Sequence, residues 1–187
     1  MQVLAICGSA RATSRSLALL QALAAAPQGW TVKVEAGLAD LPVFSPDRKG
    51  PPAPPSVEAL LTAISKADAL VIVSPEYVRS FPGGLKNAVD WCVSRPEIPG
   101  KPIALAHASH RGDEMLGQLR RVLETVSSRF TPEIFLRLPI SSLAPAEVAG
   151  ALAAASPEMN GFWASLAGFV RGSAAFAEFP AFPRNGA

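Results

Sequence analysis

The sequence predicts an α/β fold in which a parallel β-sheet is covered by helices on both faces. Short, continuous apolar runs alternate along the 187-residue chain with longer stretches whose apolar residues recur at helical spacing. Strands that are apolar throughout are typical of parallel sheets buried on both faces. Hydrophobic residues make up 49% of the chain and charged residues 17%, which is enough apolar material for such a core. Strands that alternate with helices imply right-handed crossover connections.

Ten elements follow from this alternation. Strands are expected at residues 3–7, 30–35, 69–73, 103–108 and 133–138, and helices at residues 14–26, 57–67, 85–93, 114–126 and 157–170. Ser14, Ser56 and Ser156 stand where helix N-caps are expected. Five strands in this sequence favour the flavodoxin-like three-layer sandwich, with strand order 2-1-3-4-5 and the ligand site at the carboxyl ends of the strands.

We predict one flavodoxin-like domain over residues 1–173 and an extended or disordered tail over residues 174–187, where no periodicity is visible. Residues 37–55 are rich in proline and form either an ordered loop near the site or a simple connector. The last expected helix carries Phe162, Trp163 and Leu166 on one side. Burial of this side on the sheet is the preferred interpretation, and a subunit interface is the alternative.

The bulk properties exclude several classes of function. A formal net charge of +2, with Lys and Arg scattered along the chain, does not favour nucleic-acid binding. No apolar run approaches the roughly 20 residues that span a bilayer, and no basic region precedes the first apolar run. Cys7 and Cys92 are far apart and form no CxxC, so neither a disulfide framework nor a metal site is expected. A reducing cytoplasm is the expected location.

The first candidate site is the loop of residues 8–16, which joins a buried strand to a helix. A helix N-terminus presents unpaired N–H groups and the positive end of its dipole, which favour an anion. Ser9, Ser14 and Ser16 add hydroxyl donors, and Arg11 adds a forked, charged donor. The dinucleotide motif GxGxxG and the triphosphate motif GxxxxGK[ST] are both absent, so a single phosphate group fits better. The alternative interpretation is an ordinary helix start capped by Ser14.

Two further segments follow strand ends at the same edge of the predicted sheet. In residues 74–84, Pro75 stiffens the strand exit and Pro82-Gly83-Gly84 allows backbone to approach a planar ring closely. Residues 109–113 follow the fourth strand. Lys86 and Asp90 are one helical turn apart and can pair on a solvated face.

Residues 2–140 resemble the NADPH-dependent FMN reductase family, which includes quinone, azo-dye and chromate reductases. The resemblance rests on Gly8-Ser9-x-Arg11-x-x-Ser14, Ser74-Pro75-Glu76-Tyr77, Leu85-Lys86-Asn87-Ala88-Val89-Asp90-Trp91 and Gly100-Lys101-Pro102. It implies bound FMN, NADPH or NADH as co-substrate, and a homodimer or homotetramer in which a neighbouring subunit borders the flavin. Lys86 and Asp90 would then belong to the subunit contact.

The resemblance also implies which residues hold the flavin. The FMN phosphate would be held by Ser9, Arg11, Ser14 and Ser16. The ring edge would lie along Pro75, Glu76, Tyr77 and Val78, mainly through backbone, with Ser109, His110, Arg111 and Gly112 on the other side. Three departures from the family stand out. Ser16 replaces a usual Asn, and Val78-Arg79 replaces a usual Asn and a small residue. The third loop, usually rich in glycine, reads Ser109-His110-Arg111-Gly112-Asp113.

The expected activity is two-electron, ping-pong hydride transfer from NAD(P)H through FMN to a small-molecule acceptor such as a quinone, a flavin or an azo compound. Arg111 is a candidate to stabilise reduced flavin or to meet the 2′-phosphate of NADPH, and His110 is a candidate to polarise an acceptor carbonyl. For both, an exposed side chain without a role is the alternative. His107 is interpreted as a buried, hydrogen-bonded core histidine, and Cys7 and Cys92 as packing residues.

Two other functions stay open on the sequence. One is a non-enzymatic electron carrier like flavodoxin, although no acidic face for a redox partner is visible. The other is a degenerate flavin-fold protein that only binds a partner or a small molecule.

Overall fold

A computed structural model describes residues 1–25, 29–48, 52–93 and 95–172 of the chain. Its centre is a five-stranded parallel sheet in the order β2-β1-β3-β4-β5. The strands are β1 (Gln2–Cys7), β2 (Thr31–Glu35), β3 (Ala69–Val73), β4 (Ile103–His107) and β5 (Phe130–Arg137). The predicted fold class and strand order are therefore confirmed.

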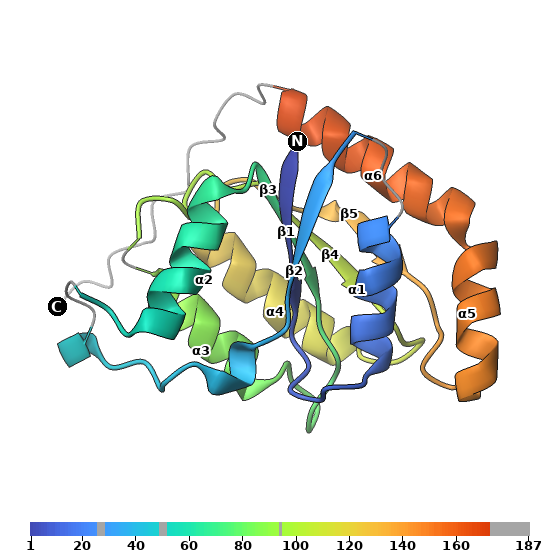
Figure 1. Cartoon of the computed structure of the whole chain (residues 1–187), viewed down its shortest axis with the longest axis horizontal. Helices are drawn as coiled ribbons and strands as arrows, with labels where there is room; N and C mark the ends of the chain where they lie inside the picture. Colours follow the sequence, from blue (N-terminus) through green and yellow to red (C-terminus); the bar gives the residue numbers. More distant parts are fainter. Residues whose placement is uncertain (26–28, 49–51, 94, 173–187) are drawn as a thin grey trace, which may run out of the picture.

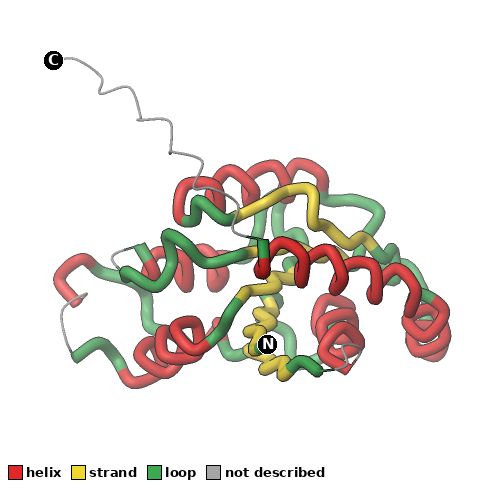
Figure 2. Tube along the Cα trace, turned by 90° about the horizontal axis from the view of Figure 1, so that it is seen from above, coloured by secondary structure: helices red, strands yellow, loops and turns green. Residues whose placement is uncertain are grey.

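Helices cover both faces of the sheet, as Figures 1 and 2 show. The helices are α1 (Arg15–Ala25), α2 (Pro55–Lys66), α3 (Gly83–Cys92), α4 (Asp113–Val126), α5 (Pro145–Ala154) and α6 (Ser156–Arg171). Helices α1, α5 and α6 pack on one face, and α2, α3 and α4 pack on the other. All five residues of β3 and all five of β4 are buried, because these central strands have helices above and below them.

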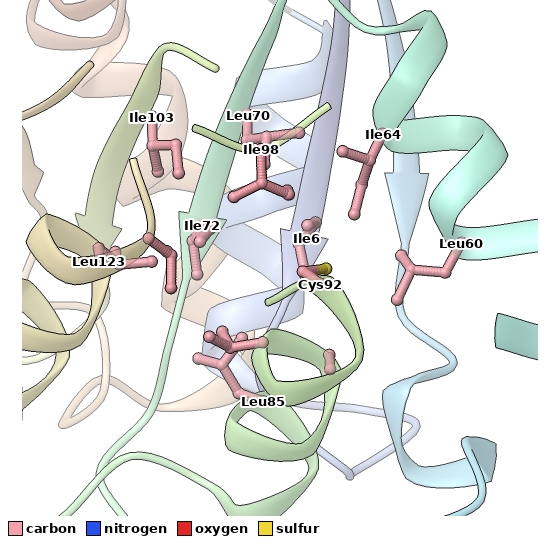
Figure 3. A pocket seen from close by; sticks show the side chains of 13 residues that line it. Ile6, Leu60, Ile64, Leu70, Ile72, Leu85, Cys92, Ile98, Ile103 and Leu123 are labelled. Atoms are coloured by element: carbon pink, nitrogen blue, oxygen red, sulfur yellow. The ribbon is translucent and has the colours of Figure 1, made fainter. Parts of the chain in front are cut away.

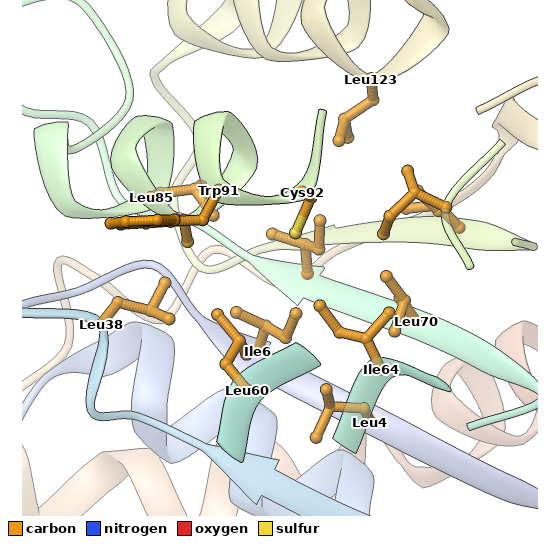
Figure 4. Close-up of a cluster of buried hydrophobic side chains, with 14 of the residues drawn as sticks. Leu4, Ile6, Leu38, Leu60, Ile64, Leu70, Leu85, Trp91, Cys92 and Leu123 are labelled. Carbon is orange, nitrogen blue, oxygen red and sulfur yellow. The ribbon is translucent and has the colours of Figure 1, made fainter. Parts of the chain in front are cut away.

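Each face of the sheet has its own hydrophobic core. Figure 4 shows the core beneath α2, α3 and α4, where Ile6 and Leu70 of the sheet meet Leu60, Leu85 and Trp91 of the helices. Figure 3 shows a small apolar void of about 30 Å³ inside this core, beside Cys92. An apolar void of this kind stays dry. It is a packing feature, and none of its residues belongs to the cleft described below.

The segment between β2 and α2 is ordered against α3 over its first part. It contains two short 3₁₀ turns, Leu38–Asp40 and Pro46–Arg48. The side chain of Asn87 accepts a hydrogen bond from the N–H of Phe44 (2.8 Å) and donates one to the carbonyl of Pro42 (3.0 Å). Trp91 donates from its indole nitrogen to the same carbonyl (2.8 Å) and packs edge-on against Phe44. Asn87 and Trp91 of α3 therefore hold the first part of this loop against the helix. Residues 49–51 of the loop lie outside the described part of the chain.

Several local expectations are corrected by the structure. Helix α5 was not expected, and β5 begins at Phe130, three residues earlier than predicted. Ser56 and Ser156 are not N-caps, because α2 begins at Pro55 and the Ser156 hydroxyl instead donates to the carbonyl of Ala153 (2.6 Å). Helix α6 buries Phe162, Trp163 and Leu166 toward the sheet, in agreement with the preferred interpretation. The expected tail over residues 174–187 lies outside the described residues.

Candidate functional site

A cleft of about 410 Å³ lies at the carboxyl ends of the strands, where the loops after β1, β3 and β4 meet. Figure 1 shows the first two of these loops at the same end of the sheet. The size is in the range of small-molecule sites. The lining residues are Ser9, Arg11, Ser14, Arg15, Ser16, Pro75, Glu76, Tyr77, His107, Ala108, Ser109, Arg111 and Ser141. The position agrees with the rule that open α/β sheets bind ligands outside the carboxyl ends of their strands.

The first loop leads from β1 into α1. The hydroxyl of Ser14 accepts a hydrogen bond from the N–H of Leu17 (3.0 Å), so Ser14 caps the helix as the simpler interpretation expected. Within the described residues, the N–H groups of Ala12, Thr13 and Ser14 itself have no hydrogen-bond partner. These donors, together with the positive end of the α1 dipole, favour an anion in the cleft.

The second loop forms a tight hairpin after β3. Tyr77 and Ser80 exchange two backbone hydrogen bonds (2.8 and 3.0 Å), and the two residues between them have positive φ, 52° at Val78 and 60° at Arg79. Positive φ at both central residues is typical of a type I′ turn, which prefers Asn-Gly. For a β-branched residue such as Val78 this conformation is an outlier. Its side chain is 99% exposed, so no burial compensates for it.

Helix α4 and the first loop hold this hairpin in place. Arg79 forms an ion pair with Glu114 (3.1 Å), and the Ser80 hydroxyl donates to the side-chain oxygen of Gln118 (2.6 Å). The hydroxyls of Tyr77 and Ser9 are hydrogen-bonded to each other (3.2 Å). These contacts from two directions explain how a strained turn persists, because strained backbone survives where its surroundings fix it.

The third loop is fastened by His107, the last residue of β4. The ring of His107 is buried, with Nδ1 2.8 Å from the carbonyl oxygen of Ser74 and Nε2 2.7 Å from that of Arg111. Gly112 follows with a φ of 95°, and a Cβ there would come within 2.9 Å of Nε2. A glycine is therefore required at this position by both its conformation and the neighbouring ring.

The charge of the cleft fits a phosphorylated ligand. Three arginines line it, against the single carboxylate of Glu76. Arg15 is tied down by a hydrogen bond to the carbonyl of Leu143 (2.6 Å), whereas the guanidinium of Arg11 bonds no described residue and is exposed. Ser16 is a buried residue that lines the cleft, and its hydroxyl bonds no described residue either. Free donors beside a basic loop suit the phosphate of FMN.

Most of the residues expected at the site line this one cleft. The exceptions are Val78, His110 and Gly112. Val78 is at the tip of the hairpin and His110 is exposed.

Sequence reasoning missed Arg15, His107, Ala108 and Ser141 as lining residues. Two of them carried a signal, since Arg15 is the first residue of α1 and His107 ends β4 at the ligand-binding edge.

The two cysteines are buried packing residues, as expected. Burial raises the pKa of the Cys7 thiol, and hydrogen bonds from Ser9 and Ser14 oppose this effect without cancelling it. Burial raises the pKa of Cys92 to about 12. Across the described residues there is no cluster of three potential metal-binding His, Cys, Asp or Glu side chains. In that same part of the chain, no helix is long and apolar enough to cross a membrane.

The sheet order defines a flavodoxin-like α/β protein, and its basic cleft lies beside the loop at the end of β1. Comparison with known families specifies the class further, since the model of the NADPH-dependent FMN reductases matches residues 1–139. The chain belongs to this family of flavin-dependent oxidoreductases.

Individual relatives agree with this assignment. The chain is 40% identical over 112 residues to an NAD(P)H-dependent FMN reductase of Pseudomonas aeruginosa and over 115 residues to a quinone reductase of Escherichia coli. Each match covers 58% of this chain and only 60% of the relative. A quinone reductase of Pseudomonas putida is 30% identical over 154 residues, or 80% of this chain and 78% of the relative.

Solved structures support the fold. The flavoenzyme NAD(P)H:(acceptor) oxidoreductase FerB of Paracoccus denitrificans superimposes with a TM-score of 0.70 at 24% identity, covering 90% of this chain and 96% of FerB. The azoreductase AzrA gives a TM-score of 0.55 at 18% identity, covering 85% of this chain and 97% of AzrA. At these identities the likeness concerns the fold alone.

Proposed function

We propose that this chain is an FMN-dependent NAD(P)H oxidoreductase that passes a hydride through the flavin to a quinone, a flavin, an azo compound or a similar small acceptor. The observation that carries the proposal is the arrangement at the start of α1. There, unpaired N–H groups, the free hydroxyl of Ser16 and the guanidinium of Arg11 face one cleft beside the backbone of the second loop. Family membership supports the same activity.

In this proposal the residues divide between the two ends of the cofactor. Ser9, Arg11, Ser14 and Ser16 hold the phosphate through hydroxyls, charge and the N–H groups of the loop. The flavin edge lies along the backbone of residues 75–78, and residues 109–112 border its other side. The tie between Ser9 and Tyr77 couples the two ends, because a shift of one loop moves the other.

When bound, FMN supplies the redox chemistry, accepting a hydride from the nicotinamide and giving it to the acceptor. The chain binds and orients the reactants. Arg111 lines the cleft and is placed to offset negative charge there, either on reduced flavin or on the 2′-phosphate of NADPH. His110 is exposed on the same loop, within reach of an acceptor outside the cleft.

A comparison of FMN with riboflavin, which lacks the phosphate, tests the assignment of the first loop. Quenching of flavin fluorescence gives both affinities. Wild-type protein should bind FMN at least about tenfold more tightly than riboflavin, since charge-assisted hydrogen bonds contribute about 1.5–3 kcal/mol. Arg11→Ala should reduce this preference without changing riboflavin affinity. Equal binding of the two flavins by wild-type protein would show that the loop holds no phosphate.

Oxidation of NAD(P)H by the FMN-loaded protein, with a quinone as acceptor, tests the activity itself. A yellow protein that no reduced nicotinamide bleaches would be an electron carrier instead. A colourless protein that cannot be reconstituted with FMN would contradict both functions.

The proposal also covers the oligomeric state and the cellular location of the enzyme. A homodimer or homotetramer would place a neighbouring subunit beside the flavin, with Lys86 and Asp90 at the contact. The two side chains form an ion pair within α3 (2.6 Å) and keep exposed surface. A cytoplasmic location suits the two free, buried thiols and a supply of NAD(P)H. Light scattering on the purified protein measures the oligomeric state.

A further inference from the structure

His107 has hydrogen-bond partners of only one kind. Its Nδ1 is 2.8 Å from the carbonyl oxygen of Ser74 and its Nε2 is 2.7 Å from the carbonyl oxygen of Arg111. A backbone carbonyl only accepts hydrogen bonds, so each ring nitrogen must donate. A neutral imidazole has one N–H and would leave the other nitrogen facing a carbonyl lone pair. The ring is 1% exposed, so water does not readily replace the missing donor.

Two carboxylates, those of Glu76 and Asp113, lie near the ring. Oε2 of Glu76 lies 3.3 Å from the position that a Cβ on Gly112 would take, and Nε2 of His107 lies 2.9 Å from it. The two groups are therefore separated by at most about 6 Å, a distance at which a carboxylate favours the protonated ring. Asp113 is the second carboxylate, and its hydrogen bond and ion pair with Arg137 lower its pKa.

Four positive groups also lie near the ring. Those around it or in the same cleft are Arg11, Arg15, Arg111 and Arg137. Arg137 is paired with Asp113, and the side chains of Arg11 and Arg111 extend into solvent. Solvent screens the charges of exposed groups, whereas the two carbonyl contacts of His107 are direct.

We propose that His107 is held as an imidazolium that ties the third loop to the end of β3 and places a fixed positive charge in the wall of the cleft. The tie is direct, because one ring bridges Ser74, at the start of the second loop, and Arg111, in the third. The absence of a Cβ at Gly112 leaves the space that the ring occupies. Within the described residues, no other side chain joins these two loops.

The charge has a consequence that rests on the proposed function. Addition of a hydride to a neutral flavin leaves one negative charge on it, and a buried cation in the wall of the same cleft favours that state. His107 does not touch the reacting atoms in this account and acts as a positioning residue. We therefore expect it to increase the affinity for reduced FMN more than the affinity for oxidised FMN.

Nitrogen-15 NMR of the wild-type protein tests the charge directly and needs no flavin. The chain has only two histidines, and His110→Gln assigns their signals. At neutral pH, both ring nitrogens of His107 should show a directly bonded proton that exchanges slowly with water. A single N–H on the ring at neutral pH, the signature of a neutral tautomer, would overturn the proposal whether or not FMN binds.

A second measurement tests the consequence for the flavin. In His107→Gln, both amide N–H donors are on one nitrogen and cannot replace donors on two separate ring nitrogens, and the charge is lost. Affinity for reduced FMN should then fall at least about tenfold more than affinity for oxidised FMN, and the midpoint potential should become more negative. Equal losses for both forms, with an unchanged potential, would show that the residue is merely structural. If neither form binds to wild-type protein, the proposed function fails while the NMR result still decides the protonation state.

Discussion

Replacement of Val78 by Asn should stabilise the protein, although most surface substitutions have little effect. Val78 has a φ of 52° in the hairpin of the second loop. An L-residue in the left-handed region costs roughly 1–2 kcal/mol, and Asn tolerates this region better than a β-branched residue. Because the side chain is 99% exposed, the substitution loses almost no burial. The expected gain is about 1 kcal/mol, which corresponds to an increase in Tm of about 2–4 °C for a chain of this size.

Val93→Asn is the matched control for this prediction. Val93 is also exposed, but it has an ordinary φ of −56° at the end of α3. Its replacement should change stability by no more than about 0.5 kcal/mol. Urea unfolding of wild type and both variants gives the free energies of unfolding. A loss of stability in Val78→Asn, or an equal gain in both variants, would refute the explanation by backbone strain.

Three further predictions concern the first loop, an ion pair and a thiol. Ser14→Ala should lower the free energy of unfolding by about 1 kcal/mol, because the N-cap is lost, and it should also weaken FMN binding. Arg11→Ala should weaken FMN binding with little effect on the free energy of unfolding. Unchanged FMN affinity in both variants would contradict the phosphate site. The guanidinium of Arg137 lowers the pKa of Asp113 below its usual 3.8. The ion pair therefore stabilises the fold fully above pH 3.8, and this stabilisation is lost as the pH falls through the lowered pKa of Asp113. The difference in stability between wild type and Asp113→Asn should therefore shrink in acid; a constant difference would contradict this. Cys92, whose pKa is raised to about 12, should not react with a disulfide reagent in the native protein and should react once urea unfolds it.

The sheet could be predicted because its central strands are apolar at every position. Ala69–Val73 is such a run. A strand buried on both faces is apolar at every position, so this pattern indicates a central strand. Helix α5 was missed because it is rich in alanine and buries only Val148 and Leu152, so it shows no clear apolar stripe. The start of β5 was missed because Pro132 argues against a strand interior. An edge strand tolerates proline, and β5 is at the edge.

The site was only partly predictable, because some of its features depend on contacts between residues far apart in the sequence. The positions of the three loops follow from the strand ends, and the sequence identifies them well. The type I′ turn was hidden because Val78-Arg79 has none of the Asn or Gly that such a turn prefers; its stability comes from the distant Glu114 and Gln118. His107 was expected to be a buried, hydrogen-bonded histidine, and it is. Its place in the cleft wall depends on the loop that folds back over it, which sequence does not reveal.

Anaerobic reduction of the FMN-loaded protein tests the central claim most directly. One equivalent of NADPH or NADH should bleach the absorbance of the bound flavin, and a stoichiometric amount of benzoquinone should restore it. Both half-reactions should proceed without free flavin, since the cleft holds FMN while nicotinamide and acceptor exchange. Bound FMN that neither NADPH nor NADH bleaches would contradict the assignment of this chain as a reductase.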